Sequence, residues 1–246
     1  MHSFREYLNA TRHPWAALVF VGPLLVAYET GLLLLDAAHA DSLRNGADAW
    51  LRTALANLGM SAVYTVPALL LFVLLLWSFR RRHDRPRDAL GLWTGMAVES
   101  FLYALVLYGL SRGLGTLLGD LGILQSHPRS TPPAQAEKVL SFLGAGIYEE
   151  TLFRLVLFAG LLSVFHLAEF PATWAVLLAA AGSSLLFAAA HNVGPYGEPF
   201  EPYVFLFRSL AGIYFASLFL LRGFGIAVGA HAGYDVLVGI LVQLET

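Results

Sequence analysis

The chain has 246 residues, of which 57% are hydrophobic and only 13% are charged, and its formal net charge is −2. Soluble domains carry about 25% charged residues, so this composition predicts a polytopic membrane protein. The chain has no basic face or tail that could neutralise phosphates, which argues against a nucleic-acid partner. The lack of cysteine excludes disulfides, thiolate nucleophiles and cysteine-ligated zinc.

Seven apolar runs are long enough to cross a bilayer, which takes about 20 helical residues. They cover residues 15–37, 61–79, 90–111, 138–167, 172–191, 203–221 and 223–243. We therefore predict an all-α polytopic membrane protein, a bundle of seven to eight transmembrane helices. The apolar runs extend from end to end, which indicates a single membrane-embedded domain over residues 1–246.

The run at 138–167 decides between seven and eight helices. Its thirty residues would make about 45 Å of helix at 1.5 Å rise per residue. The segment is therefore either strongly tilted or divided near Gly144 and Gly146. A division there would reverse the topology of everything downstream.

Residues 41–58 are less apolar and carry Asp41, Arg44, Asp48 and Arg52 among alanine, leucine and tryptophan. This pattern fits a short amphipathic helix lying at the membrane interface. An ordinary extramembrane loop fits it as well.

Arginines gather directly after the second run, at Arg80, Arg81, Arg82, Arg85 and Arg87. The positive-inside rule places this cluster in the cytoplasm, and the N-terminus with it. We expect a multi-pass protein of a bacterial-type cytoplasmic membrane. The loops 112–137 and 192–202 then fall on the opposite side, where 192–202 is a candidate lid or rim.

Three short stretches place ionisable side chains inside or at the end of apolar runs, where insertion costs roughly 2.5 kcal/mol or more per group. Such residues usually mark a functional interior. The stretches are Glu149-Glu150-x-x-x-Arg154, Phe187-x-x-x-His191 and His231-x-x-x-Asp235.

In the first stretch, Glu150 and Arg154 are four residues apart and share a helix face, so they can form an ion pair. Glu149 lies about 100° round the helix and is free to act on another group. A buried ion-pair ladder that only orients helices is the alternative interpretation. Stability alone hardly explains two adjacent acids here, because buried pairs seldom recover their desolvation cost.

In the second stretch, Phe187 and His191 share a face, so the phenyl ring can wall in the imidazole. A lone histidine at a helix end is also a common cap. In the third, Asp235 is placed to accept from the His231 imidazole or to face the same cavity. Glycines at 225, 229 and 233 form a small-residue stripe on the opposite face, which indicates that one face packs and the other faces a site.

Together these residues predict a site that activates water, in one of two ways. In the metal-free version, Glu149 takes a proton from water that His191 helps to orient, while His231 and Asp235 stabilise the oxyanion. In the metal version, His191, His231 and a carboxylate bind a divalent ion such as zinc, and Glu149 is a ligand or the base. The sequence does not choose between them.

The three motifs, in this order on hydrophobic helices, resemble those of the CPBP family of CAAX proteases and bacteriocin-processing proteins, also called Abi, over about residues 138–240. The resemblance implies an intramembrane endopeptidase, glutamic or metal-dependent, with Glu149 as base and His191 sharing its water. It implies an oxyanion or ligand pair at His231 and Asp235. Some members have asparagine at the last position, and an aspartate there donates poorly unless protonated or bridged to His231, which favours a metal-binding or orienting role.

We therefore expect a peptidase that cleaves a lipidated or transmembrane-anchored protein at the bilayer. Its N-terminal helices would lie in 1–137 and its catalytic helix core, with the active site, in 138–243. The site residues would be Glu149, His191, His231 and Asp235, oriented by Glu150, Arg154 and Phe187, with the first four as ligands if a metal is present. The alternatives are a proton-coupled transporter and a non-enzymatic immunity or scaffold protein on the same fold.

Overall fold

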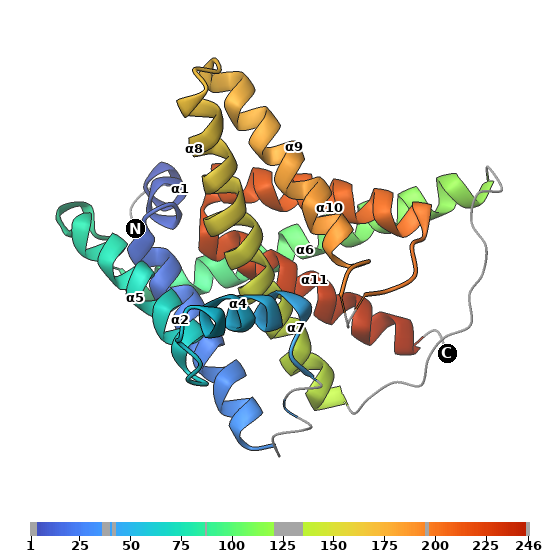
Figure 1. Ribbon diagram of the computed structural model, residues 1–246, viewed down its shortest axis with the longest axis horizontal. Helices are drawn as coiled ribbons and strands as arrows, with labels where there is room; N and C mark the ends of the chain where they lie inside the picture. Colours follow the sequence, from blue (N-terminus) through green and yellow to red (C-terminus); the bar gives the residue numbers. More distant parts are fainter. Residues whose placement is uncertain are drawn as a thin grey trace.

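The computed structural model describes residues 4–35, 40, 43–86, 88–120, 135–194 and 197–244, and every regular element in these ranges is helical. Each of the seven predicted apolar runs contains helix (Figure 1). In chain order these helices are α2 (Pro14–Leu33), α5 (Thr65–Arg80), α6 (Ala89–Asp120), the joined α7 (Gln135–Glu150), η2 (Thr151–Phe158) and α8 (Ala159–Leu167), α9 (Ala172–Ala190), α10 (Pro202–Arg222) and α11 (Phe224–Leu244). The remaining described elements are α1 (Phe4–Thr11), α4 (Gly46–Asn57) and the short 3-10 helix η1 (Arg82–Asp84).

Five helices of the described part are long and apolar enough to cross a membrane, whereas Thr65–Arg80 and Phe224–Gly239 are apolar but shorter. The protein is therefore a polytopic helical membrane protein, as predicted. The count of seven to eight spans is not supported. One reason lies in α5, which begins only at Thr65, since residues 61–64 of the predicted run are not helical.

The helix at 138–167 is not divided at Gly144 and Gly146, so of the two alternatives the division is wrong. Both glycines lie inside α7, which runs without a break through the π-helical η2 into α8. Gly146 is instead a point of close approach to α11, because a Cβ added there would lie 2.8 Å from the backbone nitrogen of Ala232. The departure from α-helical geometry comes one turn later, directly after Glu150, and π-helical turns are frequent at functional sites.

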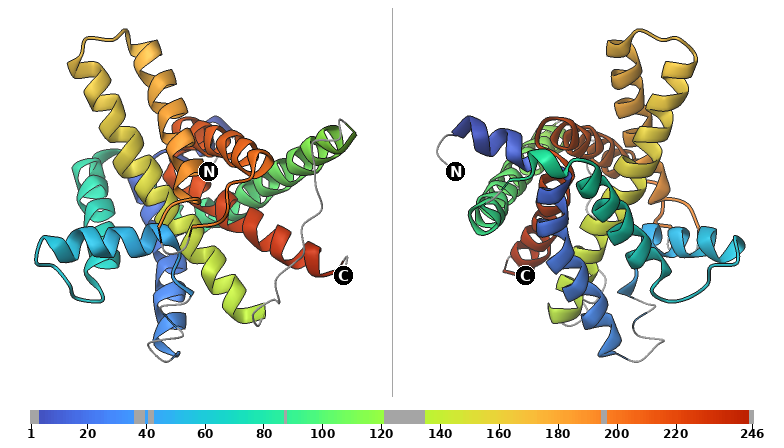
Figure 2. Two further views of the ribbon diagram at one scale, coloured as in Figure 1. Left: turned by 45° about the vertical axis from the view of Figure 1, so that its right-hand side comes forward. Right: turned by 90° about the vertical axis from the view of Figure 1, so that its left-hand side faces the viewer.

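The helix α11 packs against α6, α7, α10 and α2, and it runs between them in the views of Figures 1 and 2. Its predicted glycine stripe lies against α6. Gly225, Gly229 and Gly233 are adjacent to Met96, Ser100 and Ala104 respectively, and these partners are also spaced by four residues. The stripe thus allows the two helices to pack closely, while the opposite face of α11 remains available for the site.

The junction of α10 and α11 is a single glycine. Gly223 has a φ of 96°, a conformation that L side chains rarely adopt, and it ends α10 one residue before α11 begins. A Cβ there would lie 2.8 Å from the carbonyl oxygen of Thr11. The turn is therefore both sharp and packed against the end of α1.

The segment 41–58 forms a helix, α4, over residues 46–57, so the loop alternative is wrong for that part. The side chain of Asn45 caps it by accepting from the backbone N–H of Asp48 at 2.8 Å. Asp48 has no exposed surface, and it pairs with Arg44 at 2.8 Å and Arg52 at 2.6 Å, one helical turn to either side. The hydroxyl of Tyr28 on α2 donates to the same carboxylate at 3.2 Å.

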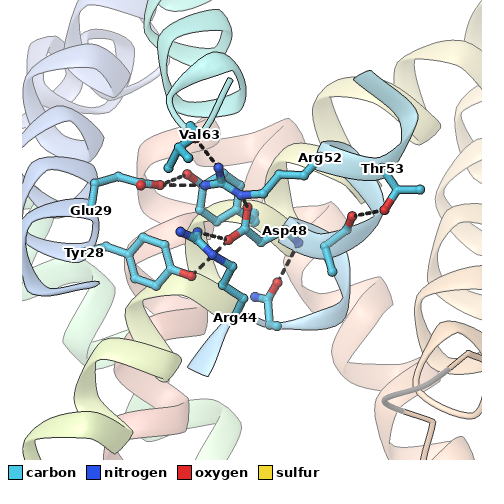
Figure 3. A network of polar contacts seen from close by, with 10 residues as sticks. Tyr28, Glu29, Arg44, Asp48, Arg52, Thr53 and Val63 are labelled. Carbon is cyan, nitrogen blue, oxygen red and sulfur yellow. Dashed lines mark hydrogen bonds and ion pairs between the residues drawn. The ribbon is translucent and has the colours of Figure 1, made fainter. Parts of the chain in front are cut away.

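This network continues from α4 to α7 (Figure 3). Arg52 lies 3.1 Å from the carboxylate of Glu29 on α2, and it also donates to the carbonyl of Val63. The hydroxyl of Tyr148, the residue before Glu149, donates to Glu29. The polar network therefore fixes α4 across α2 and α7, next to the two predicted glutamates.

Two further expectations are corrected. Arg208 lies in a predicted span, where pairing with Glu29 or Glu99 of another span is one interpretation, but it pairs with Glu198 of the 192–202 segment. Glu99 pairs instead with Arg222 at 2.5 Å and accepts from the hydroxyl of Tyr7 on α1. The loop predicted from residue 112 begins later, because α6 continues to Asp120; residues 121–134 lie outside the described part.

Candidate active site

Glu149, on the last turn of α7, is the point where the three predicted motifs meet. Its Oε2 lies 3.8 Å from Nε2 of His191, at the end of α9, and 3.7 Å from Nε2 of His231 on α11. The carboxylate is 12% exposed. These separations are too long for direct hydrogen bonds, and polar contacts of this length are commonly bridged by water.

The orientation of His191 is set by its own helix. Its Nδ1 lies 2.8 Å from the backbone carbonyl of Phe187, and because a carbonyl can only accept, Nδ1 carries the hydrogen. The ring of Phe187 meets the imidazole edge-on at 4.9 Å between centroids. In the neutral ring, Nε2 then presents its lone pair towards Glu149.

His231 is held from two sides. Its Nδ1 lies 2.9 Å from Oε1 of Glu150, and its ring stacks on Phe215 of α10 at 4.4 Å and 12°. Its Nε2 lies 3.7 Å from Asp235 Oδ2, the same distance as from Glu149. Asp235 therefore faces the shared site, but it does not accept from Nδ1 of His231, because that N–H donates to Glu150.

Glu150 and Arg154 form the predicted ion pair, with 3.1 Å between Oε2 and Nε and no exposed surface on either side chain. Arg154 Nη2 also donates to the carbonyl of Gly212 on α10 at 3.1 Å. Because Glu150 bonds to His231 as well, one buried chain of contacts joins α10, the α7–η2 helix and α11. The spacing of the motif revealed only the Glu150–Arg154 part of this chain.

A cavity of about 60 Å³ opens beside Glu149 and His191. Its wall is completed by Phe153, Ala190 and Val193 and by three residues of α4, namely Gly46, Ala47 and Trp50. The contribution of α4 was missed, although its amphipathic pattern with one tryptophan was a signal that it covers something. The roles of Phe215 and Gly212 in the site were also not predicted, because nothing in the local sequence distinguishes them from other residues of transmembrane helices.

The hydrogen bonds of the two histidines are relevant to the metal version of the site. Each histidine donates a hydrogen bond from Nδ1 to an acceptor, as metal-ligating histidines do with their second nitrogen. In each ring Nε2 is directed at a carboxylate. However, no group of three or more histidine, aspartate or glutamate side chains among the described residues is gathered closely enough to hold a metal ion. The metal version of the site therefore stays a prediction.

Residues 136–237 match the family described as Type II CAAX prenyl endopeptidase Rce1-like. This segment contains all three motifs, and the resemblance to the CAAX protease family is confirmed over it. No curated protein and no solved structure matches the chain.

Proposed function

We propose that this chain, whose segment 136–237 matches the Rce1-like CAAX endopeptidase family, hydrolyses a peptide bond of a membrane-anchored protein. One observation carries the proposal. Glu149 lies between the Nε2 atoms of His191 and His231, at 3.8 and 3.7 Å, beside a small cavity within a membrane-spanning helical protein. Such a site can hold and deprotonate water where few other water molecules compete.

The geometry supports a general-base mechanism. A water molecule between Glu149 and His191 would give one proton to the Glu149 carboxylate and direct its other hydrogen to the Nε2 lone pair of His191. The water oxygen attacks the scissile carbonyl carbon, and the carbonyl oxygen becomes an oxyanion. Glu149 then passes its proton to the leaving nitrogen as the C–N bond breaks, which yields a carboxylic acid and an amine.

His231 is placed to stabilise the oxyanion. Its Nδ1 hydrogen is committed to Glu150, so only a hydrogen on Nε2 can reach the reacting group, and that requires the protonated ring. Asp235 and Glu149 both face Nε2, and their negative charges would support a hydrogen there. In this proposal Asp235 acts on His231 and not on the oxyanion itself, a role that requires an acceptor and not a donor.

The experiment is the cleavage of a synthetic CAAX-type peptide, a prenylated cysteine followed by three residues, by the protein in lipid nanodiscs. Glu149→Gln should lower the rate by about 100-fold or more, the contribution typical of a general base. Because the carboxamide keeps the shape of the side chain, the thermal unfolding midpoint should change little. Glu169→Gln, in the distant turn between α8 and α9, is the control. Undiminished proteolysis by Glu149→Gln would reject the assignment.

The same assay tests the metal version. Activity that survives exhaustive chelation, with less than one metal ion per protein by elemental analysis, supports the metal-free route. Activity that chelation abolishes and zinc restores would support the metal version, with His191, His231 and a carboxylate as ligands and Glu149 as ligand or base, and it would reject the metal-free route.

A further inference from the structure

One face of α10 is directed at the site. Arg154 donates to the carbonyl of Gly212, and the ring of Phe215 stacks on His231. Arg208 precedes these residues by four and seven positions, so it shares their helix face. The three residues Arg208, Gly212 and Phe215 form what we call the α10 site stripe. Arg208 is its charged end, nearest the 192–202 segment.

The charge of Arg208 is coupled to the catalytic groups. It interacts electrostatically with Glu149, His191 and Asp235. Arg154, the other cation near these groups, is fully buried and already committed to Glu150 and Gly212. Arg208 is therefore the described cation whose charge can still be offered to a molecule entering the site.

The present partner of Arg208 is a side chain outside the membrane-spanning helices. Nη2 lies 2.8 Å from Oε2 of Glu198, whose side chain is 57% exposed, while that of Arg208 is only 20% exposed. The backbone of Glu198 is fixed beside the site, because its N–H donates to the carbonyl of His191 at 2.7 Å. The side chain of Asn192 donates to its carbonyl at 3.0 Å. A carboxylate is thus held on Arg208 from the solvent side.

An exposed ion pair contributes little stability, because water screens it and both side chains lose freedom. Another carboxylate can therefore replace Glu198 at small cost. A cation is costly within a membrane-spanning helix and is usually kept there for function. The acids Glu149, Glu150 and Asp235 would repel an anionic substrate unless a cation compensated.

On the basis of the proposed function, we propose that Arg208 binds a carboxylate of the peptide substrate and that Glu198 occupies this position in the free protein. The carboxylate comes either from the free C-terminus of the substrate or from an acidic side chain near the scissile bond. Both would exchange with Glu198 for the same guanidinium.

The test uses one prenylated CAAX-type peptide in three synthetic forms: the free acid, the C-terminal amide, and the amide with a glutamate as the last residue. For the wild type, kcat/KM should be at least about tenfold higher for the free acid than for the amide, as expected for a charge-assisted hydrogen bond. Recovery with the glutamate-bearing amide would show that a side-chain carboxylate can take the same position on Arg208. No recovery would identify the C-terminus.

Arg208→Gln should reduce the acid-to-amide ratio towards one, whereas Arg208→Lys should keep part of it. Glu198→Gln should raise kcat/KM for the free acid through a lower KM, because it removes the resident competitor. A merely structural ion pair would predict a loss instead. The matched controls are Arg82→Gln and Glu169→Gln, which remove one positive and one negative charge elsewhere in the molecule. An unchanged ratio in Arg208→Gln would overturn the proposal.

A binding measurement separates this proposal from the peptidase function. The Glu149→Gln protein, which should not cleave, is titrated with fluorescent forms of the acid and amide peptides. Preference for the acid that disappears with Arg208→Gln supports the carboxylate site even if no peptide is hydrolysed. Equal binding of both forms contradicts it even if the wild type is an active peptidase.

Discussion

Glu150 is the residue on which the geometry of the site depends. Its carboxylate lies 2.9 Å from His231 Nδ1 and 3.1 Å from Arg154 Nε, with no exposed surface. A buried charge of this kind is stable only while its partners remain. Glu150 therefore has two roles: it neutralises Arg154, and it fixes which nitrogen of His231 faces Glu149.

We expect Glu150→Gln to destabilise the protein by about 3–5 kcal/mol, because it leaves the charge of Arg154 buried without a counter-charge. Chemical unfolding in detergent micelles measures the change in the free energy of unfolding. Cleavage should fall as well, since an amide holds His231 less firmly than a carboxylate does. Wild-type stability of Glu150→Gln would show that Glu150 is not needed to neutralise the buried charge of Arg154.

The double variant Glu150→Leu with Arg154→Met separates the two roles of Glu150. Replacing a buried ion pair by apolar side chains of similar volume is often neutral or stabilising. The double variant should thus recover much of the lost stability, yet stay inactive because His231 has lost its acceptor. An active double variant would mean that Glu150 serves folding alone.

The sequence allowed the Glu150–Arg154 pair to be predicted, because partners four residues apart share a helix face. The bond between Glu150 and His231 joins residues 81 positions apart, and no local pattern encodes such a contact. The same applies to Phe215, which stacks on His231 although its neighbours are ordinary apolar residues. The cost of burying their charges made it predictable that the three motifs converge. The hydrogen bond and the ring stacking that join them were not predictable, because they link residues far apart in the sequence.

At the scale of helices, the crossing of α7 and α11 sets the distance between Glu149 and His231. The crossing is close at Gly146, where an added Cβ would approach the nitrogen of Ala232 and the carbonyl oxygen of Val228 to 2.8 and 2.9 Å. Backbone atoms cannot move aside as a flexible side chain can. The two helices themselves would have to separate.

Gly146→Ala should therefore cost about 1–3 kcal/mol, the usual range for overpacking, and should lower the cleavage rate. The control is Gly160→Ala in α8, where an added Cβ meets nothing within 4 Å. That substitution should raise stability by up to about 1 kcal/mol through helix propensity. Thermal unfolding and peptide cleavage of both variants measure the difference, and equal behaviour of the two would show that the crossing tolerates a methyl group.

The sequence left a helix break at Gly144 and Gly146 open as one alternative, which the low helix propensity of glycine would favour. Close helix packing uses glycine for the opposite reason, to let two continuous helices approach. The choice between these uses depends on what lies opposite each glycine. In α11 the regular spacing of the glycines at 225, 229 and 233 indicated a helix-packing face. Glycines two residues apart, as at 144 and 146, do not share a helix face, so their spacing gave no such indication.

Across the whole molecule, the segments that the predicted topology assigns to each side of the membrane gather at two ends. At one end, His13 Nε2 lies 2.9 Å from the carbonyl of Arg81, and Arg12 donates to the carbonyl of Leu221 at 2.5 Å. At the other end, α4 meets the turn after α9, where Trp50 is adjacent to Gly194. The cavity beside Glu149 belongs to this second end.

Because the arginine cluster belongs to the first end, the positive-inside rule predicts that this end is cytoplasmic and that the cavity lies near the opposite surface. The chain contains no cysteine, so single cysteines can report the orientation without a background signal. Arg82→Cys should react with a membrane-impermeant maleimide only in inverted vesicles, and Val193→Cys only in intact cells. Glu169→Cys, in the turn between α8 and α9, should follow Arg82→Cys, because α9 separates it from Val193. If Val193→Cys reacts from the cytoplasmic side, the site opens there, and substrates should be sought among proteins anchored to the inner leaflet.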